Sequence, residues 1–400
     1  MRQTKKILAL NTGSSSIKFS LYKIGESEEL VLTGSLSRIG YPGGEFSVRD
    51  AQGNSLENCL VALKDHERAC EYVFTWIRSQ GESCRPHAVG HRIVSGGRNY
   101  STPQIVTSEL IAALEDLIPY APEHLPQALT ALKYALKLFP EINHVTCFDT
   151  AFHRDMPAVA KLYAFPEPIR RLGVQRFGFH GLSYEYILGE LERQKETGGN
   201  PRRVILAHLG HGSSMAAVLD GKSIDTTMGF SPAGGLVMST RTGDLDPGVL
   251  LFLMQQERMT SIELNALINR HSGLLGISGV SDDMQVLLSL QRENTDAREA
   301  VDLFCYRAKQ WIGSYAAVMG GLDCLVFSGG IGENAGEIRS RICDGLGFLG
   351  IDIDFSRNSS SAPVISSNNS SVAVRVIKTN EEVMLARHTF NLLAEAPYQS

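Results

Sequence analysis

The sequence predicts a two-domain α/β protein in which one structural motif occurs twice. A chain of 400 residues is longer than a single hydrophobic core usually accommodates. Apolar segments with strand spacing alternate with segments of helical spacing along its whole length. In addition, residues 6–20 (KILALNTGSSSIKFS) match residues 204–218 (VILAHLGHGSSMAAV) without gaps, 198 positions later. These three observations indicate two related halves.

The repeated motif has the pattern of a phosphate-binding hairpin. In both copies a short apolar run enters a turn of small residues, and a second apolar run leaves it; Ser15-Ser16 aligns with Ser213-Ser214. Glycine allows the positive φ angles of such a turn, and consecutive backbone N–H groups with hydroxyls form an anion-binding nest. Two ordinary β-hairpins with small-residue turns are the alternative. The paired match favours two nests that hold a polyphosphate.

The remaining elements continue the α/β alternation. We expect a hairpin at each copy of the motif, at residues 6–22 and 204–220. A Ser/Asn-rich segment at residues 356–371 is expected to be a surface loop. Further strands are predicted at 29–36, 88–94, 144–148, 324–328 and 372–377, and helices at 58–80, 108–139 (interrupted at 119–122), 297–320, 337–346 and 381–393.

Composition restricts the class of protein and its partners. The chain is 43% hydrophobic and 20% charged, with a net charge of −5 and no dense block of Lys and Arg. Nucleic acid and anionic membranes are therefore not expected partners. No apolar run is long enough to span a bilayer, and the first six residues lead into a strand without a signal-peptide pattern. Seven scattered cysteines without a C-x-x-C pair suit reduced thiols, so we expect a cytoplasmic protein.

Two nucleotide-binding patterns occur but are weak. Residues 216–223 (AAVLDGKS) approach a Walker A sequence, but the first position is Ala and the segment has the pattern of a strand and hairpin turn. Residues 330–335 (GIGENA) match the permissive dinucleotide pattern G-x-G-x-x-A between a predicted strand and a predicted helix. The second pattern favours a nucleotide that lies against this backbone turn.

Phosphoryl transfer requires a metal site, and three residues could supply oxygen ligands. Asn11 lies in the first turn, Asp149 follows a strand, and Glu381 begins the last helix. Each residue type is also common at its position for structural reasons. Asn and Asp form turns, and Glu is favourable in the first turn of a helix.

Cationic residues beside glycine-rich turns could neutralise the transferred group. Arg92 precedes Ser95-Gly96-Gly97, and Arg241 lies in the segment STRTGD. Arginine binds phosphate or carboxylate in a bidentate manner, although either residue could be a surface arginine without a role. Lys18 follows the first nest. His180 lies between glycines, which leave an imidazole accessible, and His208 ends the apolar run of the second copy.

Together with these residues, longer motifs resemble the acetate kinase family, within the superfamily of acetate and sugar kinases, Hsc70 and actin (ASKHA). They occur in family order over almost the whole chain, and their joint occurrence is specific. The matching segments are LNTGSSSIK (10–18), HR (91–92), FDTAFH (148–153), FGFHG (177–181), AHLG (207–210), TRTGDLDPG (240–248), FSGGIGEN (327–334) and TNEE (379–382).

The resemblance implies a fold and an activity. The fold would be two duplicated ASKHA domains of the RNase H-like type with an active-site cleft between them: 1–150 plus 379–400, and 151–378. The activity would be reversible, Mg²⁺-dependent, direct in-line transfer of the γ-phosphoryl group of ATP to acetate, giving acetyl phosphate and ADP. Mn²⁺ is an alternative metal, and a homodimer is implied.

The resemblance also implies roles for individual residues. Asn11 and Glu381 would hold the metal. Catalysis would involve Arg92, Asp149, His180 and Arg241, with Asp149 positioning the reacting group and His180 stabilising the transferring phosphoryl. The acyl substrate would contact Arg92, Val94, Glu123, Phe179 and Pro232. The nucleotide would contact Ser14, Lys18, His208, Leu209, Gly210, His211, Gly212, Asp283, Met284, Gln285, Gly330, Ile331, Gly332, Glu333 and Asn334.

The sequence departs from the family pattern at several of these positions. His211 replaces an Asn in the second nest, Gln285 an Arg near the nucleotide, and Ser95 a His after Arg92. Glu123 and Leu125 lie where the family has A-P-L-H-N-P, beside the acyl pocket. The departures leave a kinase of propionate or another short carboxylate as an alternative. Two further alternatives also stay open: a non-catalytic ATP-binding module of the same fold, and a dehydrogenase that uses residues 330–335.

Overall fold

The computed structural model describes residues 3–194 and 201–395, and the chain divides into two compact units. One unit comprises Met1–Ala151 and Asn380–Ser400, and the other comprises Phe152–Thr379. Residues 1–2 and 396–400, which belong to the predicted N-terminal domain, lie outside the described part. The chain leaves the first unit in the 3-10 turn η3 (Ala151–His153) and returns after Thr379. The cleft expected between the two domains stays a prediction.

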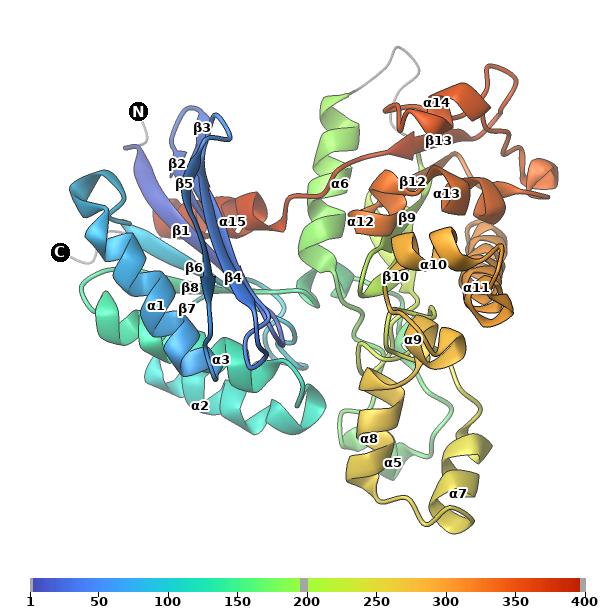
Figure 1. Cartoon of the computed structure of the whole chain (residues 1–400), viewed down its shortest axis with the longest axis horizontal. Coiled ribbons are helices and arrows are strands. Elements are labelled where there is room, and N and C mark those ends of the chain that lie inside the picture. Colours follow the sequence, from blue (N-terminus) through green and yellow to red (C-terminus); the bar gives the residue numbers. More distant parts are fainter. Residues whose placement is uncertain (1–2, 195–200, 396–400) are drawn as a thin grey trace. The chain divides into compact units, whose positions relative to one another are not determined.

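The described part of the first unit contains one mixed sheet and four α-helices (Figure 1). The strand order is β5-β4-β3-β2-β1-β6-β8-β7. The strands are β1 (Lys5–Thr12), β2 (Ile17–Ile24), β3 (Glu28–Ser37), β4 (Gly44–Asp50), β5 (Ser55–Val61), β6 (Ala88–Ile93), β7 (Gln104–Ile105) and β8 (Asn143–Phe148). The helices are α1 (His66–Ser79), α2 (Ser108–Asp116), α3 (Leu125–Leu138) and α15 (Glu381–Glu395), with 3-10 turns η1 (Gly81–Ser83) and η2 (Ile118–Tyr120).

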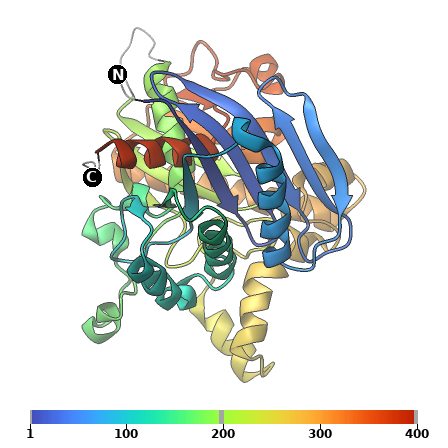
Figure 2. The ribbon, with the colours of Figure 1, turned by 90° about the vertical axis from the view of Figure 1, so that its left-hand side faces the viewer.

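Helices cover both faces of the first sheet. Leu8 and Leu10 of β1 pack in one core with Phe74 of α1 and Ala135 of α3. On the opposite face, α15 approaches the sheet so closely that a Cβ added at Gly90 of β6 would lie 2.4 Å from Thr389 Oγ1. The view in Figure 2 shows this last helix of the chain alongside the first strand. The C-terminal helix is therefore an integral part of the N-terminal unit.

The second unit contains a five-stranded sheet in the order β11-β10-β9-β12-β13. Its strands are β9 (Arg203–Leu209), β10 (Ser213–Leu219), β11 (Lys222–Thr226), β12 (Cys324–Ser328) and β13 (Ala373–Val376). Its helices are α4 (Ala158–Lys161), α5 (Glu167–Arg171), α6 (Gly181–Arg193), α7 (Pro247–Gln255), α8 (Ser261–Arg270), α9 (Gly273–Ser278), α10 (Met284–Leu290), α11 (Thr295–Met319), α12 (Gly329–Asn334), α13 (Gly336–Cys343) and α14 (Phe355–Ser359), with the 3-10 turn η4 (Gly347–Leu349).

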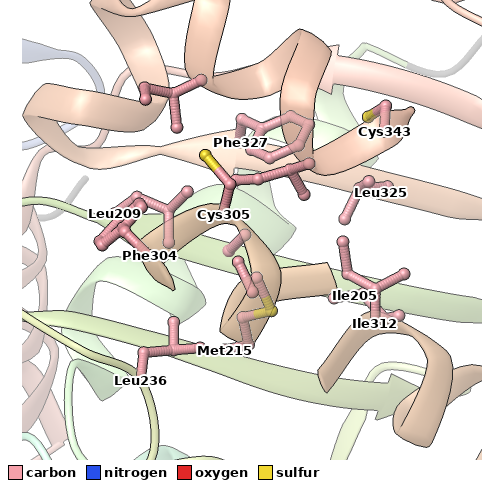
Figure 3. Packing of buried hydrophobic residues seen from close by; sticks show 14 of the residues in the cluster. Ile205, Leu209, Met215, Leu236, Phe304, Cys305, Ile312, Leu325, Phe327 and Cys343 are labelled. Atoms are coloured by element: carbon pink, nitrogen blue, oxygen red, sulfur yellow. The ribbon is translucent and has the colours of Figure 1, made fainter. Parts of the chain in front are cut away.

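The second sheet is also buried on both faces. Alternate residues of β9 and β12, such as Ile205 and Phe327, pack against α11 and α13 in the larger core (Figure 3). The intervening residues, such as Leu206 and Val326, pack against Tyr184 and Ile187 of α6. This period of two buries both faces of the sheet, and the polar turn between Leu209 and Ser213 lies at the end of β9.

The two sheets confirm the predicted duplication. In the first unit, β3-β2-β1 form an antiparallel meander, and β6 and β8 run parallel to β1. In the second unit, β11-β10-β9 and then β12 and β13 repeat this order and these directions. The ungapped alignment does not hold through the turn, however. Ile7 pairs with Tyr22 but Ile205 pairs with Ala217, and these partners are not aligned with one another.

Three sequence predictions of local structure were wrong. Residues 55–61 form β5 and not the start of a helix, because their apolar positions alternate against β4, and α1 begins only after the N-cap Asp65. The surface loop expected at 356–371 was wrong over residues 356–359, which belong to α14 and include the buried Asn358, while the rest of the segment is irregular. Residues 330–334 are themselves helical, in α12, and do not form a turn before a helix.

Most other predicted elements are observed, including strand 324–328 and the helix that begins at residue 381. None of the helices in the described part of the chain is both long and apolar enough to cross a membrane.

Candidate active site

The first unit gathers polar residues at the ends of three neighbouring strands. Asn11 is the penultimate residue of β1, Arg92 that of β6, and Asp149 follows β8 directly. Because β1, β6 and β8 are parallel, their carboxyl ends lie at one edge of the sheet. Glu381 enters the same place from the first turn of α15. The structure therefore brings together the two residues expected to hold metal and two of those expected to act in catalysis.

Hydrogen bonds link these four side chains. Arg92 Nε donates to Asp149 Oδ1 and Oδ2 at 3.1 and 3.0 Å, and its Nη1 donates to Asn11 Oδ1 at 2.9 Å. Asn11 Nδ2 donates to the carboxylates of Glu381 and Glu382, at 3.1 Å each. Arg92 Nε also lies 3.8 Å from Glu381 Oε2. Asp149 is fully buried, so the bidentate pair with Arg92 compensates the cost of its charge.

The charges of this cluster are strongly coupled. Burial disfavours the charged guanidinium of Arg92, but the carboxylates of Asp149, Glu381 and Glu382 outweigh burial and raise its pKa. Within residues 3–194 and 201–395, no group of three His, Cys, Asp or Glu side chains could hold a metal alone. A hard cation at Glu381 and Asn11 would therefore need further oxygen ligands, such as phosphate oxygens.

The other residues predicted in the first unit come from the β1–β2 hairpin, from the end of β6 and from the turn before α3. Lys18 is the cross-strand partner of Asn11 and, with Arg49 and Glu382, lines a small pocket of about 170 Å³. Ser14 is exposed in the β1–β2 turn. Val94, just after β6, is buried, and Glu123 is half-buried in the turn before α3.

The second unit places several polar groups around the turn between β9 and β10. A Cβ added at Gly212 would lie 3.3 Å from His180 Nε2 and 3.8 Å from Arg241 Nη1. A Cβ added at Gly210 would lie 3.7 Å from both His208 Nε2 and the backbone nitrogen of Gly330. Two imidazoles, a guanidinium and a backbone N–H thus approach this short turn. Such a set of donors suits the oxygens of a phosphate chain.

His180 is held in this position by its own loop. It adopts a left-handed conformation (φ 60°) as the N-cap of α6, and Gly178 before it also has positive φ. A Cβ at Gly178 would lie 2.5 Å from the ring of His153. His153 Nε2 lies 3.1 Å from the carbonyl oxygen of Phe179, and burial lowers the pKa of His153 to about 4. A neutral His153 therefore packs against Gly178 and binds the carbonyl of Phe179, which stabilises the loop that carries His180. The sequence did not reveal this role.

A pocket of about 680 Å³ lies next to this turn. It is formed by the β9–β10 turn, the start of α10 and helix α12. His211 lies 3.9 Å from Asp282 across one side. Desolvation lowers the pKa of His211, Asp282 raises it and Arg241 lowers it further. Because the side chain is 68% exposed, solvent screening makes each of these effects on the pKa small. Eight residues predicted to contact the nucleotide line the pocket: Gly210, His211, Asp283, Met284, Gln285, Gly330, Ile331 and Asn334.

The remaining predicted contacts have structural partners in the second unit. Glu333 accepts hydrogen bonds from the backbone nitrogens of Gly329 and Thr379, at 3.0 and 3.1 Å. Leu209 and Gly332 are buried, so only their backbone is available to a ligand. Phe179 is also buried, and Pro232 offers its carbonyl to Arg241 Nη1 at 3.2 Å.

The sequence did not reveal Arg339, a fully buried arginine beside the pocket. Its Nη1 donates to the carbonyls of Gly332 and Glu333, and its Nε donates to Asn358 Oδ1. Arg339 therefore ties the end of α12 to the Ser/Asn-rich segment. Arg339 is the fourth residue of α13 and follows the glycine-rich segment 329–336, but this position alone does not indicate a buried role.

Comparisons with known proteins agree with this arrangement. The model of the acetokinase family matches residues 6–387. An acetate kinase of Rhodopseudomonas palustris (strain TIE-1) is 43% identical over 392 residues, covering 96% of this chain and 98% of its own. The crystal structure of Porphyromonas gingivalis acetate kinase has a TM-score of 0.84 and 37% identity, covering 97% and 100%. That of a propionate kinase from Francisella tularensis has a TM-score of 0.87 and 34% identity, covering 97% and 99%.

Proposed function

Because the chain belongs to the acetokinase family, we propose that it is an ATP:acetate phosphotransferase that forms acetyl phosphate and ADP reversibly. The convergence of His180 and Arg241 on the Gly212 turn, next to a pocket of nucleotide size, carries this proposal. A phosphoryl group in transfer spreads negative charge over its oxygens, and donors fixed in advance stabilise that charge. A carboxylate is already nucleophilic, so the reaction needs little acid–base chemistry.

The cluster of the first unit suits the acceptor and the metal. Arg92 offers a cation to the carboxylate substrate, and Asp149 holds its guanidinium in one orientation through two hydrogen bonds. Asn11, Glu381 and Glu382 supply the oxygen donors that Mg²⁺ prefers. Bound there, Mg²⁺ or Mn²⁺ would neutralise phosphate charge, with phosphate oxygens completing its ligands.

The pocket of the second unit suits the nucleotide. The β9–β10 turn would bind the phosphates through backbone N–H groups and His208, while the pocket between α10 and α12 would take the nucleoside. Asp282 and Ser239 line this pocket and offer partners for ribose hydroxyls. His211 and Gln285 stand at its wall, where they would modulate the choice of nucleotide.

The acceptor is acetate or another short carboxylate. Propionate is the second candidate, because a propionate kinase is among the similar structures and because Glu123 and Leu125 lie where acetate kinases have other residues. ADP formation measured with formate, acetate, propionate and butyrate tests the proposal. The highest kcat/KM is expected for acetate. ADP formation that does not depend on any carboxylate would contradict it.

We also propose that the protein is a cytoplasmic homodimer. Helix α7 has no buried residue, although it contains Val249, Leu251, Phe252 and Met254. Leu251 and Phe252 are each 56% exposed, and Figure 1 shows α8 and α5 at the same end of this unit. We propose that a second copy of the chain covers this apolar surface, in line with the homodimer that the family resemblance implies. All seven cysteines are free thiols, which suits a reducing compartment.

A further inference from the structure

Two stacked histidines line the turn between β9 and β10, and each is fixed by a hydroxyl. The rings of His180 and His208 stack with centroids 4.3 Å apart. His208 Nδ1 lies 2.8 Å from Ser183 Oγ, and His180 Nδ1 lies 2.9 Å from Ser214 Oγ. In both rings the Nδ1 atom is thus engaged by serine, while Nε2 is the atom near the turn.

The serine that holds His180 is itself held by a deeply buried phenol. Ser214 Oγ and Tyr184 Oη are hydrogen-bonded to one another, and both residues are fully buried. Tyr184 lies in the first turn of α6, and its ring packs against the rings of Phe152 and His153. Burial raises the pKa of Tyr184, and the hydrogen bond to Ser214 only partly opposes this. The phenol is therefore protonated at neutral pH, and its buried O–H group needs a hydrogen-bond acceptor.

The direction of these hydrogen bonds follows from the proton count. Ser214 has one proton, so it can donate either to His180 Nδ1 or to Tyr184 Oη. Among the described residues, Ser214 is the hydrogen-bond partner of Tyr184 Oη. If Ser214 donated to Tyr184, the buried phenol proton would have no acceptor, which is costly. Tyr184 therefore donates to Ser214. If His180 Nδ1 also donated to Ser214, the proton of this buried hydroxyl would have no acceptor among the described residues, so Ser214 donates to His180 Nδ1.

We propose that Tyr184, acting through Ser214, is a positioning residue that keeps His180 neutral with its proton on Nε2. This inference rests on the proposed function, because the Nε2 proton of His180 has a catalytic role only if phosphoryl transfer takes place at this turn. An Nε2–H directed at the Gly212 turn can donate to an oxygen of the transferring phosphoryl group. The other tautomer would present a lone pair to the same oxygen. Repulsion between this lone pair and the phosphoryl oxygen would destabilise the transition state, while the contacts of the protein with the rest of the nucleotide would be unchanged.

The tautomer can be measured without turnover. Protein with ¹⁵N-labelled histidine is examined by long-range ¹H–¹⁵N NMR, and the His180 signals are assigned by their loss in His180→Gln. We expect the ¹⁵N shift of an unprotonated Nδ1 and a protonated Nε2 in the native protein. In Tyr184→Phe both shifts should move toward those of exchanging tautomers. A protonated Nδ1 in the native protein, or a Tyr184→Phe spectrum identical to the native one, would overturn the proposal.

Kinetics provide the second measurement. Tyr184→Phe should lower kcat by about fivefold to tenfold, the equivalent of one hydrogen bond, with KM for ATP and acetate within about twofold. Tyr315→Phe is the matched control. Tyr315 is equally buried, but its oxygen has no hydrogen-bond partner among the described residues. An equal fall of kcat in both variants would overturn the positioning role.

If Tyr184→Phe does not fold, Ser214→Ala removes the middle of the same chain of hydrogen bonds and should give the same NMR change. The two proposals fail separately. A native protein that forms no acyl phosphate contradicts the proposed function, whereas the NMR result reports on His180 in either case.

Discussion

Asn11 and Glu381 are 370 positions apart, yet the amide of Asn11 donates a 3.1 Å hydrogen bond to the carboxylate of Glu381. The contact joins the first strand of the chain to its last helix. It forms because α15 packs on the face of the sheet that α1 and α3 leave uncovered, close against Gly90. The metal ligands proposed for this unit therefore exist only when both ends of the chain have folded together.

Replacing Glu381 should weaken metal activation. Glu381→Gln keeps the shape of the side chain and its contact with Asn11 but removes the charge that attracts Mg²⁺. We expect the Mg²⁺ concentration at half-maximal activity to rise by roughly tenfold or more. Glu28→Gln is the control, since Glu28 also binds α15, through Arg387, but lies away from Asn11. Equal Mg²⁺ dependence in both variants would contradict the metal role of Glu381.

Removing either arginine of the two clusters should impair the chemical step. Arg241→Ala should lower kcat/KM by roughly 10²–10⁴-fold, because a fixed cation is lost from the transition state. Arg92→Ala should show a similar loss, but it also removes the guanidinium that pairs with the buried Asp149. Arg92→Lys preserves the charge and separates the two effects.

Thermal unfolding of each variant serves as the check on folding, and Arg68→Ala on the surface of α1 serves as the control. A folded Arg241→Ala variant with near-native turnover would remove Arg241 from the catalytic residues.

Glu123 should influence the choice of acid. A carboxylate beside an anionic substrate disfavours binding unless a cation compensates it, and it gives no apolar contact to a longer chain. Glu123→Leu should improve kcat/KM for propionate and butyrate relative to acetate, by about fourfold per methylene, since a buried methylene is worth about 0.8 kcal/mol. The ratios of the three acids in both proteins provide the measurement. Unchanged ratios would mean that Glu123 does not contact the substrate.

Acid should destabilise the second unit through His153. Its pKa is about 4 in the folded state, below the usual 6.5, because burial disfavours the charged ring. Between about pH 6.5 and pH 4, His153 is therefore protonated in the unfolded chain but not in the folded chain. The free energy of unfolding falls as pH falls through this range. The expected loss from this residue is about 2 kcal/mol between about pH 7 and pH 5.

Urea unfolding of His153→Gln should show a smaller decrease over this pH range than the native protein. The buried His91 and His144, whose pKa values are also lowered by burial, would account for the decrease that persists. His271→Gln, at an exposed position, should behave as the native protein. If the unfolding free energy of His153→Gln fell with pH as much as that of the native protein, His153 would have to accept a proton in the folded state.

Disrupting the apolar surface of α7 should separate the proposed dimer. Phe252→Glu places a charge where a second chain would pack, and light scattering should report the mass of one chain instead of two. Phe355→Glu is a matched control, because Phe355 is also an exposed phenylalanine but belongs to α14. A dimer in Phe252→Glu, or a monomeric native protein, would contradict this interface.

The sequence predicted the features that depend on local pattern. The paired hairpins and the helix beginning at Glu381 follow from periodicity and small-residue turns, and the sheet order of both units matches the duplication. Strand β5 was missed because its weak alternation overlaps the helical pattern of α1. The roles of Arg339, His153 and Tyr184 could not be predicted. Each depends on partners that are brought close only by packing: Asn358, the Phe179 carbonyl and Ser214.

The most direct test of the account is acyl phosphate formation. The protein is incubated with ATP, Mg²⁺ and acetate, and hydroxylamine traps any acyl phosphate as a hydroxamate. We predict hydroxamate in an amount equal to the ADP formed, requiring both acetate and Mg²⁺ and strongly reduced in Arg241→Ala. ADP without hydroxamate, or no reaction with any of the short carboxylates, would contradict the assignment of this chain as a carboxylate kinase.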